Sequence, residues 1–253
     1  TITDELLTFE DYEIIKREEV RKNSRSRGNN IINSVVIHYT GGYALDGSIN
    51  TLVQRGLSYH YIINRTGAVF NFVDEERAAF HAGCWANDPL CIYPDITDRS
   101  IGISFANAGW VYGCKSLAEL NQATSEGRKN ECYEEYSLEA LNAGAILVAD
   151  LACRHENIII GKMFDEEGNN LGGSFIGHEE IYLDKPDPGP LFDWDYFIQR
   201  VIVHYINNCE TASRDKISYV RPVDEELDPF LEETSMVEET NFVFEDETGG
   251  EVL

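Results

Sequence analysis

Two neighbouring stretches decide how this chain can fold: GHEE at residues 177–180 and KPDPGP at residues 185–190. The prolines of the second stretch fix their own backbone angles and push the residues before them toward extended geometry. Lys185 and Asp187 each precede a proline, so we expect both to be extended. Residues two apart in an extended chain point the same way, which predicts that the ammonium and the carboxylate face one common space.

His178 directly follows the apolar run at residues 175–177, which predicts a short buried strand. An imidazole at a strand end and a carboxylate nine residues later suit two ligands of a zinc site, and a catalytic zinc keeps one further position open. A hydrogen-bonded core histidine followed by a turn aspartate would give the same pattern. On these residues alone both interpretations stay open.

A second histidine occurs in the run VVIHYT at residues 35–40. The continuous β-branched residues predict a strand buried on both faces and therefore central in a sheet. Strand alternation places His38 on the same face as Val36 and Thr40. His38 is then either a core histidine with a hydrogen-bonded neighbour or a metal ligand at the exit of the strand.

The remaining pattern of helices and buried strands predicts an α/β fold, in which the ends of neighbouring strands would bring His38 and His178 together. Helices are expected at residues 46–55, from Ser137 and from Asp193, each with a polar cap. A hairpin is expected at residues 59–73, and a buried strand at residues 100–106. Residues 84–99 and 108–135 are expected to be surface excursions and loop.

Composition excludes some functions. The net charge of −25 disfavours nucleic acid, whose binding proteins carry basic patches. No stretch of 18 apolar residues occurs, so no membrane span is expected. The acidic start of the chain does not match a signal peptide. Six cysteines occur without a Cys-x-x-Cys pair, which predicts free thiols rather than disulfides or a structural zinc knuckle.

The uneven charge suggests a domain plan. Residues 1–30 are predicted to be an N-terminal extension, 31–208 the catalytic domain, and 209–253 an acidic C-terminal tail. From residue 221 onward the chain carries 12 acidic residues and one arginine. Such a segment is either solvated and disordered or folds on a protein partner, and both alternatives stay open.

Six motifs occur in the order and rough spacing of the type-2 N-acetylmuramoyl-L-alanine amidases, and residues 31–205 resemble that family. The motifs are VIH at 36–38, SYHYII at 58–63, FHAG at 80–83, SIGI at 100–103, GHE at 177–179 and KPDPGP at 185–190. The resemblance implies a mixed sheet flanked by helices, with a zinc-bearing groove. It carries the zinc ligands onto His38, His178 and Asp187.

The resemblance also implies catalytic roles for Tyr59 and Lys185, which match the assisting tyrosine and lysine of phage-type members. His81 is predicted to line the substrate groove. Members that act on muropeptides have a glutamate where this chain has Ser104, so a glutamate general base is absent at that position. His60 faces away from Tyr59 and is interpreted as structural.

The expected function is therefore zinc-dependent hydrolysis of the amide between N-acetylmuramic acid and L-alanine in peptidoglycan or muropeptides, as in a phage-type lysin. A non-catalytic peptidoglycan-binding module and a virion structural component carrying a lytic domain are the alternatives. Without a signal peptide, the expected location is the host cytoplasm before release, or the virion. The acidic tail is expected to dock on a protein partner in a virion or secretion assembly.

Overall fold

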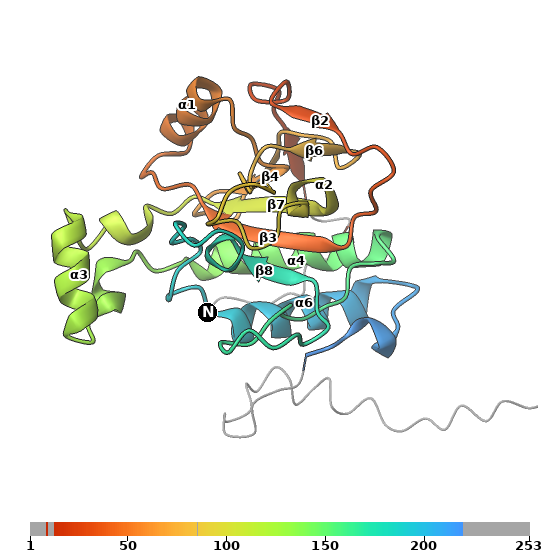
Figure 1. The fold of residues 1–253 in the computed structure, drawn as a ribbon. Coiled ribbons are helices and arrows are strands. Elements are labelled where there is room, and N and C mark those ends of the chain that lie inside the picture. Colours follow the sequence, from red (N-terminus) through yellow and green to blue (C-terminus); the bar gives the residue numbers. More distant parts are fainter. Residues whose placement is uncertain (1–8, 10–12, 85, 220–253) are drawn as a thin grey trace, which may run out of the picture. The chain divides into compact units, whose positions relative to one another are not determined.

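The protein, described here from a computed structural model over residues 9, 13–84 and 86–219, is built on a six-stranded mixed sheet (Figure 1). The strand order is β1-β5-β4-β7-β3-β8. The strands of this sheet are β1 (Ile14–Lys16), β3 (Ser34–Tyr39), β4 (Tyr61–Ile63), β5 (Val69–Asn71), β7 (Ser100–Phe105) and β8 (Phe175–Gly177). A separate antiparallel pair joins β2 (Ser24–Ser26) to β6 (Arg77–Ala79).

The middle of the sheet is parallel. β3 lies between β7 and β8 and is parallel to both, and β4 is parallel to β7. Only β4 and β5, the predicted hairpin, run antiparallel within this sheet. Gly67 occupies the turn between them with a positive φ of 81°, a conformation that glycine adopts without a steric penalty. The carboxyl ends of β3, β7 and β8 therefore meet at one edge.

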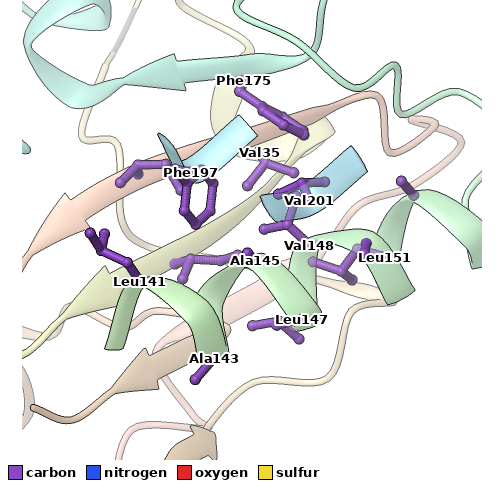
Figure 2. Packing of buried hydrophobic residues seen from close by; sticks show 14 of the residues in the cluster. Val35, Leu141, Ala143, Ala145, Leu147, Val148, Leu151, Phe175, Phe197 and Val201 are labelled. Carbon is purple, nitrogen blue, oxygen red and sulfur yellow. The ribbon is translucent and has the colours of Figure 1, made fainter. Parts of the chain in front are cut away.

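One face of the sheet is covered by the two long helices α4 (Leu138–Arg154) and α6 (Trp194–Asn208). Both begin at the predicted caps, because Ser137 and Asp193 accept hydrogen bonds from backbone N–H groups of the first turns. Figure 2 shows how side chains of both helices gather with those of β3 and β8 in one apolar cluster. Burial of this cluster, at about 25 cal/mol per Å² of apolar surface, is the main force holding the layers together.

The opposite face carries smaller elements. The helix α1 (Leu45–Arg55) packs Ile49 and Leu52 against Ile62 of β4. Gly56 ends α1 in the left-handed conformation, as expected, but the helix starts after Ala44 without a side-chain cap. The single turns α2 (Ile96–Arg99) and α5 (His178–Ile181) complete this side.

The segment before residue 31 contributes to the same folded unit. β1 extends the main sheet next to β5, and β2 pairs with β6. At the other end, Ile217 bridges to Ile160, and a short turn of 3₁₀ helix, η3 (Arg214–Lys216), precedes it. The boundaries predicted at residues 31 and 208 thus fall inside this unit, since backbone pairing continues beyond both. The acidic tail from residue 221 lies outside the described residues.

The predicted loop at residues 108–135 contains more helix than expected. It holds η1 (Gly109–Val111), α3 (Leu117–Ser125) and η2 (Lys129–Cys132). Ser116 caps α3 by accepting a hydrogen bond from the N–H of Glu119. The sequence predicted a loop here because few apolar residues of α3 pack against the rest of the protein. The hydrophobic periodicity of this helix is therefore weak.

The prediction of free thiols is wrong. All six cysteines are paired, as Cys84–Cys91, Cys114–Cys132 and Cys153–Cys209. The partners are 7, 18 and 56 residues apart in the sequence, and the fold rather than a short motif brings them together. The first two disulfides close the two surface excursions, and the third joins α4 to the end of α6. No helix among the described residues is long and apolar enough to cross a membrane.

Candidate metal centre

The register of β3 and β8 places two histidines side by side. Ile37 and Gly177 are paired across the parallel strands, so His38 and His178 occupy the next positions at the carboxyl edge. His178 starts the short helix α5, where the strand ends. Their side chains are buried, and their ring centroids are 4.5 Å apart. The two strand ends therefore meet as the sequence predicted.

The loop at residues 185–190 brings the third group to this edge. The Asp187 carbonyl accepts a hydrogen bond of 2.8 Å from the Glu179 N–H. In return, the Glu179 carboxylate accepts one of 3.2 Å from the Gly189 N–H. These bonds fix the proline-rich loop on α5, at the residue that directly follows His178. The Asp187 side chain is then buried against both histidines.

The three predicted ligands converge. Nδ1 of His38 lies 2.8 Å from Oδ2 of Asp187, and Nδ1 of His178 lies 3.1 Å from both carboxylate oxygens. One potential ligand atom of each residue lies within 4.8 Å of those of the other two. Two imidazole nitrogens and one carboxylate form a three-ligand set of the kind found in catalytic zinc sites.

The other ring nitrogens show that this set suits a cation. Nε2 of His178 lies 2.9 Å from the Ala82 carbonyl, which can only accept, so a ring with a single proton carries it on Nε2. Nδ1 of His178 then presents a lone pair to the Asp187 carboxylate. Two acceptors facing one another need a positive charge between them, which a metal ion supplies.

Electrostatics favours a neutral His38. Burial and the neighbouring His178 lower the pKa of His38 to about 4, against the opposing effect of Asp187. Burial would raise the pKa of Asp187, but the adjoining imidazoles of His178 and His38 outweigh burial and lower it. A neutral imidazole beside an ionised carboxylate is the protonation state that metal ligation requires.

Tyr59 and Lys185 flank this centre at different depths. The ring of Tyr59 is half-buried, and its centroid lies 4.9 Å from that of His38. Burial, and then the charge of Asp187, raise the pKa of the Tyr59 hydroxyl, which therefore stays protonated at neutral pH. Lys185 is exposed, with its ammonium 5.6 Å from the ring centroid of Tyr182. Its charge nevertheless contributes to lowering the pKa of His38.

His81 lies behind His38 and is buried, with 6% of its surface exposed. Its Nδ1 is 3.1 Å from Nε2 of His38. The sequence predicted that His81 lines the substrate groove; the structure places its side chain in the interior, against His38. His60, interpreted as structural, accepts a hydrogen bond from the Gly102 N–H at 2.9 Å and lies 2.9 Å from the Arg77 carbonyl.

Ser104, at the position where some family members have a glutamate, is paired with His38 across β3 and β7. Paired residues of parallel neighbours point to the same face, so the Ser104 side chain lies beside the metal centre. It is fully buried. Sequence reasoning did not single out Glu179. Its half-buried carboxyl has a pKa raised to about 7, first by partial burial and then by the charge of Glu180.

Comparison with known protein families matches residues 27–190 to the family described as N-acetylmuramoyl-L-alanine amidase. This match covers well over half of the chain. The chain belongs to the N-acetylmuramoyl-L-alanine amidase family. All six site residues of this amidase-family chain lie inside the matched segment.

Among curated proteins, the chain is 27% identical over 185 residues to N-acetylmuramoyl-L-alanine amidase AmiD of Escherichia coli strain K12. That alignment covers 68% of this chain and 54% of AmiD. The chain thus spans about half the length of this curated relative.

Two solved structures resemble this amidase-family chain. The E. coli AmiD complex with anhydro-N-acetylmuramic acid-L-Ala-D-gamma-Glu-L-Lys has a TM-score of 0.48 at 24% identity, covering 70% of this chain and 58% of AmiD. The endolysin N-acetylmuramoyl-L-alanine amidase LysCS from Clostridium intestinale URNW has a TM-score of 0.50 at 15% identity, with 75% and 95% covered. At these identities both likenesses concern the fold alone.

Proposed function

We propose that this protein is a zinc-dependent amidase that hydrolyses the bond between the lactyl group of N-acetylmuramic acid and L-alanine. The observation that carries the proposal is the convergence of His38, His178 and Asp187 in a chain of this family. The name and bound substrate of AmiD support a peptidoglycan fragment as the substrate class.

The two Nδ1 atoms and the Asp187 carboxylate would hold the zinc. A zinc ion bound there supplies Lewis acidity, which polarises the scissile carbonyl and acidifies water. The chain's own contribution is to keep His38 neutral through burial, and to direct the Nε2 protons of both rings to acceptors so that their Nδ1 atoms face Asp187. The buried carboxylate adds the negative charge that retains a divalent cation.

Tyr59 and Lys185 are proposed to stabilise the negative charge that develops on the carbonyl oxygen. The Tyr59 hydroxyl keeps its proton and can donate it in a hydrogen bond beside His38. Lys185 is exposed and can swing from Tyr182 toward a bound substrate. Removing one such donor commonly costs about 10²–10³-fold in kcat. Ser104 lacks the acidity and basicity of a glutamate, so the proton transfers fall to other groups.

Within this function we propose a phage-type, wall-lytic role, because the tyrosine and lysine are present and the glutamate is replaced by Ser104. The three disulfides add a condition, since disulfides persist in oxidising compartments and are rare in reducing ones. We therefore propose that the protein acts outside a reducing cytoplasm, either virion-associated or in the envelope. Docking of the acidic tail on a partner is a separate proposal, which deletion of residues 221–253 would test.

The deciding experiment measures zinc content and stem-peptide release together, by elemental analysis and by mass spectrometry of digested muropeptides. Wild type should carry one zinc per chain and release free peptides that begin with L-alanine. His178→Ala should lose both properties. Stoichiometric zinc without product would indicate a recognition module or a virion structural component instead. A zinc-free wild type that still releases peptides would contradict the proposed zinc dependence.

A further inference from the structure

Both ligand histidines are oriented by one dipeptide. The Nε2 atom of His38 contacts Nδ1 of His81 at 3.1 Å, and Nε2 of His178 contacts the carbonyl of Ala82 at 2.9 Å. His81 and Ala82 are adjacent in the sequence, and both are buried. A single short segment therefore contacts the side of each imidazole that faces away from Asp187.

Hydrogen bonds link His38 through His81 and Ser100 to the Ile96 carbonyl. Their directions follow from this carbonyl, where the series ends. The carbonyl of Ile96 can only accept, so the Ser100 hydroxyl donates to it at 2.7 Å. The Ser100 oxygen then accepts the proton on Nε2 of His81, 3.1 Å away. With its proton on Nε2, His81 has a lone pair on Nδ1 and accepts from Nε2–H of His38. The lone pair of His38 is thereby fixed on Nδ1, toward Asp187.

β7 is shaped to admit this arrangement. Its residues alternate between the apolar side chains of Ile101 and Ile103, which face α4, and the small residues Ser100, Gly102 and Ser104 on the other face. A Cβ atom at Gly102 would lie 2.5 Å from Cγ of His81, closer than real Cβ contacts. The His81 ring thus occupies space that only glycine leaves free.

We propose that His81 and Ser100 are positioning residues of the metal centre, which hold His38 in the tautomer that binds zinc. This inference rests on the proposed zinc site, and it assigns His81 to the support of a ligand rather than to the substrate groove. Outer partners of metal-bound histidines commonly change metal affinity by about 10–100-fold when they are removed.

The test measures zinc affinity of the purified full chain by competition with a chromogenic chelator, together with the visible spectrum of the Co²⁺-loaded protein. His81→Ala should weaken zinc binding by about 10–100-fold and alter the Co²⁺ bands. His81→Asn should recover part of the affinity, because its amide oxygen can accept from His38. Ser100→Ala should weaken binding in the same direction as His81→Ala, by a smaller factor.

Ser34→Ala is the matched control. Ser34 is paired with Ser100 in the register of β3 and β7, and it is equally buried, but its hydroxyl donates to Asn33. Its zinc affinity should equal that of wild type. Wild-type affinity in a folded His81→Ala protein would overturn the proposal.

A measurement on the unmodified protein covers the case in which His81→Ala fails to fold. Nitrogen-15 chemical shifts of the zinc-loaded wild type report which ring nitrogen carries each proton. We expect protons on Nε2 of both His38 and His81. A proton on Nδ1 of His81 would contradict the hydrogen bonds from His38 to His81 and from His81 to Ser100, and would overturn the proposal. A different result would contradict the proposed function: normal zinc binding without release of stem peptides.

Discussion

Two carboxylates of this protein, the buried Asp187 and the half-buried Glu75, each contact histidine, yet their surroundings differ in one decisive respect. Glu75 receives donors: the Tyr61 hydroxyl at 2.5 Å, and the two terminal nitrogens of Arg154 at 2.8 and 2.9 Å. Nε2 of His155 is 2.6 Å away. Asp187 instead faces two nitrogens whose ring protons are directed elsewhere.

The difference separates a structural cluster from a binding site. Around Glu75 the chain itself supplies hydrogen-bond donors for the carboxylate oxygens. The Tyr61 and Arg154 donors connect β4 to the end of α4 through this carboxylate. Around Asp187 the chain gathers acceptors and leaves the positive charge to be supplied from outside. Convergence of unmatched acceptors, rather than the presence of histidine and carboxylate, is what indicates a metal.

The substitution Asp187→Asn should give the largest effect, because it replaces an anionic acceptor by an amide that can donate to Nδ1 of a histidine. We expect zinc affinity and amidase activity to fall by more than about 100-fold, beyond the loss typical of an outer partner. The zinc-free variant should unfold at or above the temperature of zinc-free wild type. Chelator competition and thermal melts measure both, and retained zinc binding would contradict the comparison.

Removing the Cys153–Cys209 disulfide should act on stability and leave the metal centre intact. The bond closes a segment of 56 residues, for which chain entropy gives a cost of about 4 kcal/mol in the free energy of unfolding. The double variant Cys153→Ala, Cys209→Ala should show this loss in urea titrations at constant zinc occupancy. A variant as stable as wild type would mean that the bond does not form in solution, which alkylation of free thiols would confirm.

Glu75→Gln should behave as the reverse of Asp187→Asn. It keeps the shape but weakens the bonds to Arg154 and His155, so we expect a loss of about 2 kcal/mol in stability, as for charge-assisted hydrogen bonds. Zinc affinity should stay unchanged. Equal loss of zinc binding would show that the two clusters are coupled, and would weaken the distinction drawn between them.

The same variant should flatten the acid side of the stability curve. Burial would raise the pKa of Glu75, but the hydrogen bonds from His155, Arg154 and Tyr61 outweigh it and lower the pKa. Because its pKa is lower in the folded state, the ionised Glu75 side chain stabilises the fold above the unfolded pKa of about 4.3. This stabilisation is lost as the pH falls below that value toward the folded pKa. Between about pH 5 and pH 2, wild type should therefore lose more stability than Glu75→Gln. Parallel curves in that window would rule out this role.

The convergence of His38, His178 and Asp187 could be predicted because the local sequence around each residue indicates its position. A β-branched run marks β3 and a short apolar run marks β8, a histidine lies at the carboxyl end of each, and prolines flank Asp187. Tyr59 could be placed near the centre only through the family resemblance, whereas Lys185 was also predicted there from its proline-flanked spacing to Asp187. The structure brings Tyr59 beside His38, while Lys185 lies at the surface.

Other features depend on contacts that no local pattern encodes. The disulfides join residues up to 56 positions apart, and β1 and β2 are three-residue strands too short to show a period. The orientation of His81 follows from its loop packing over β7. One signal was nevertheless present, since alternate small residues at 100, 102 and 104 leave room for large side chains on that face.

The pairing of Ile37 with Gly177 has a consequence for how this chain can change length. Because strand residues alternate between faces, one residue inserted within β8 would turn His178 to the side of α4 and α6 and abolish the site. Residues added to the disulfide-closed excursions would leave that alignment untouched. The chain can therefore acquire new surface segments freely there, while the ten residues from His178 to Asp187 keep a fixed length.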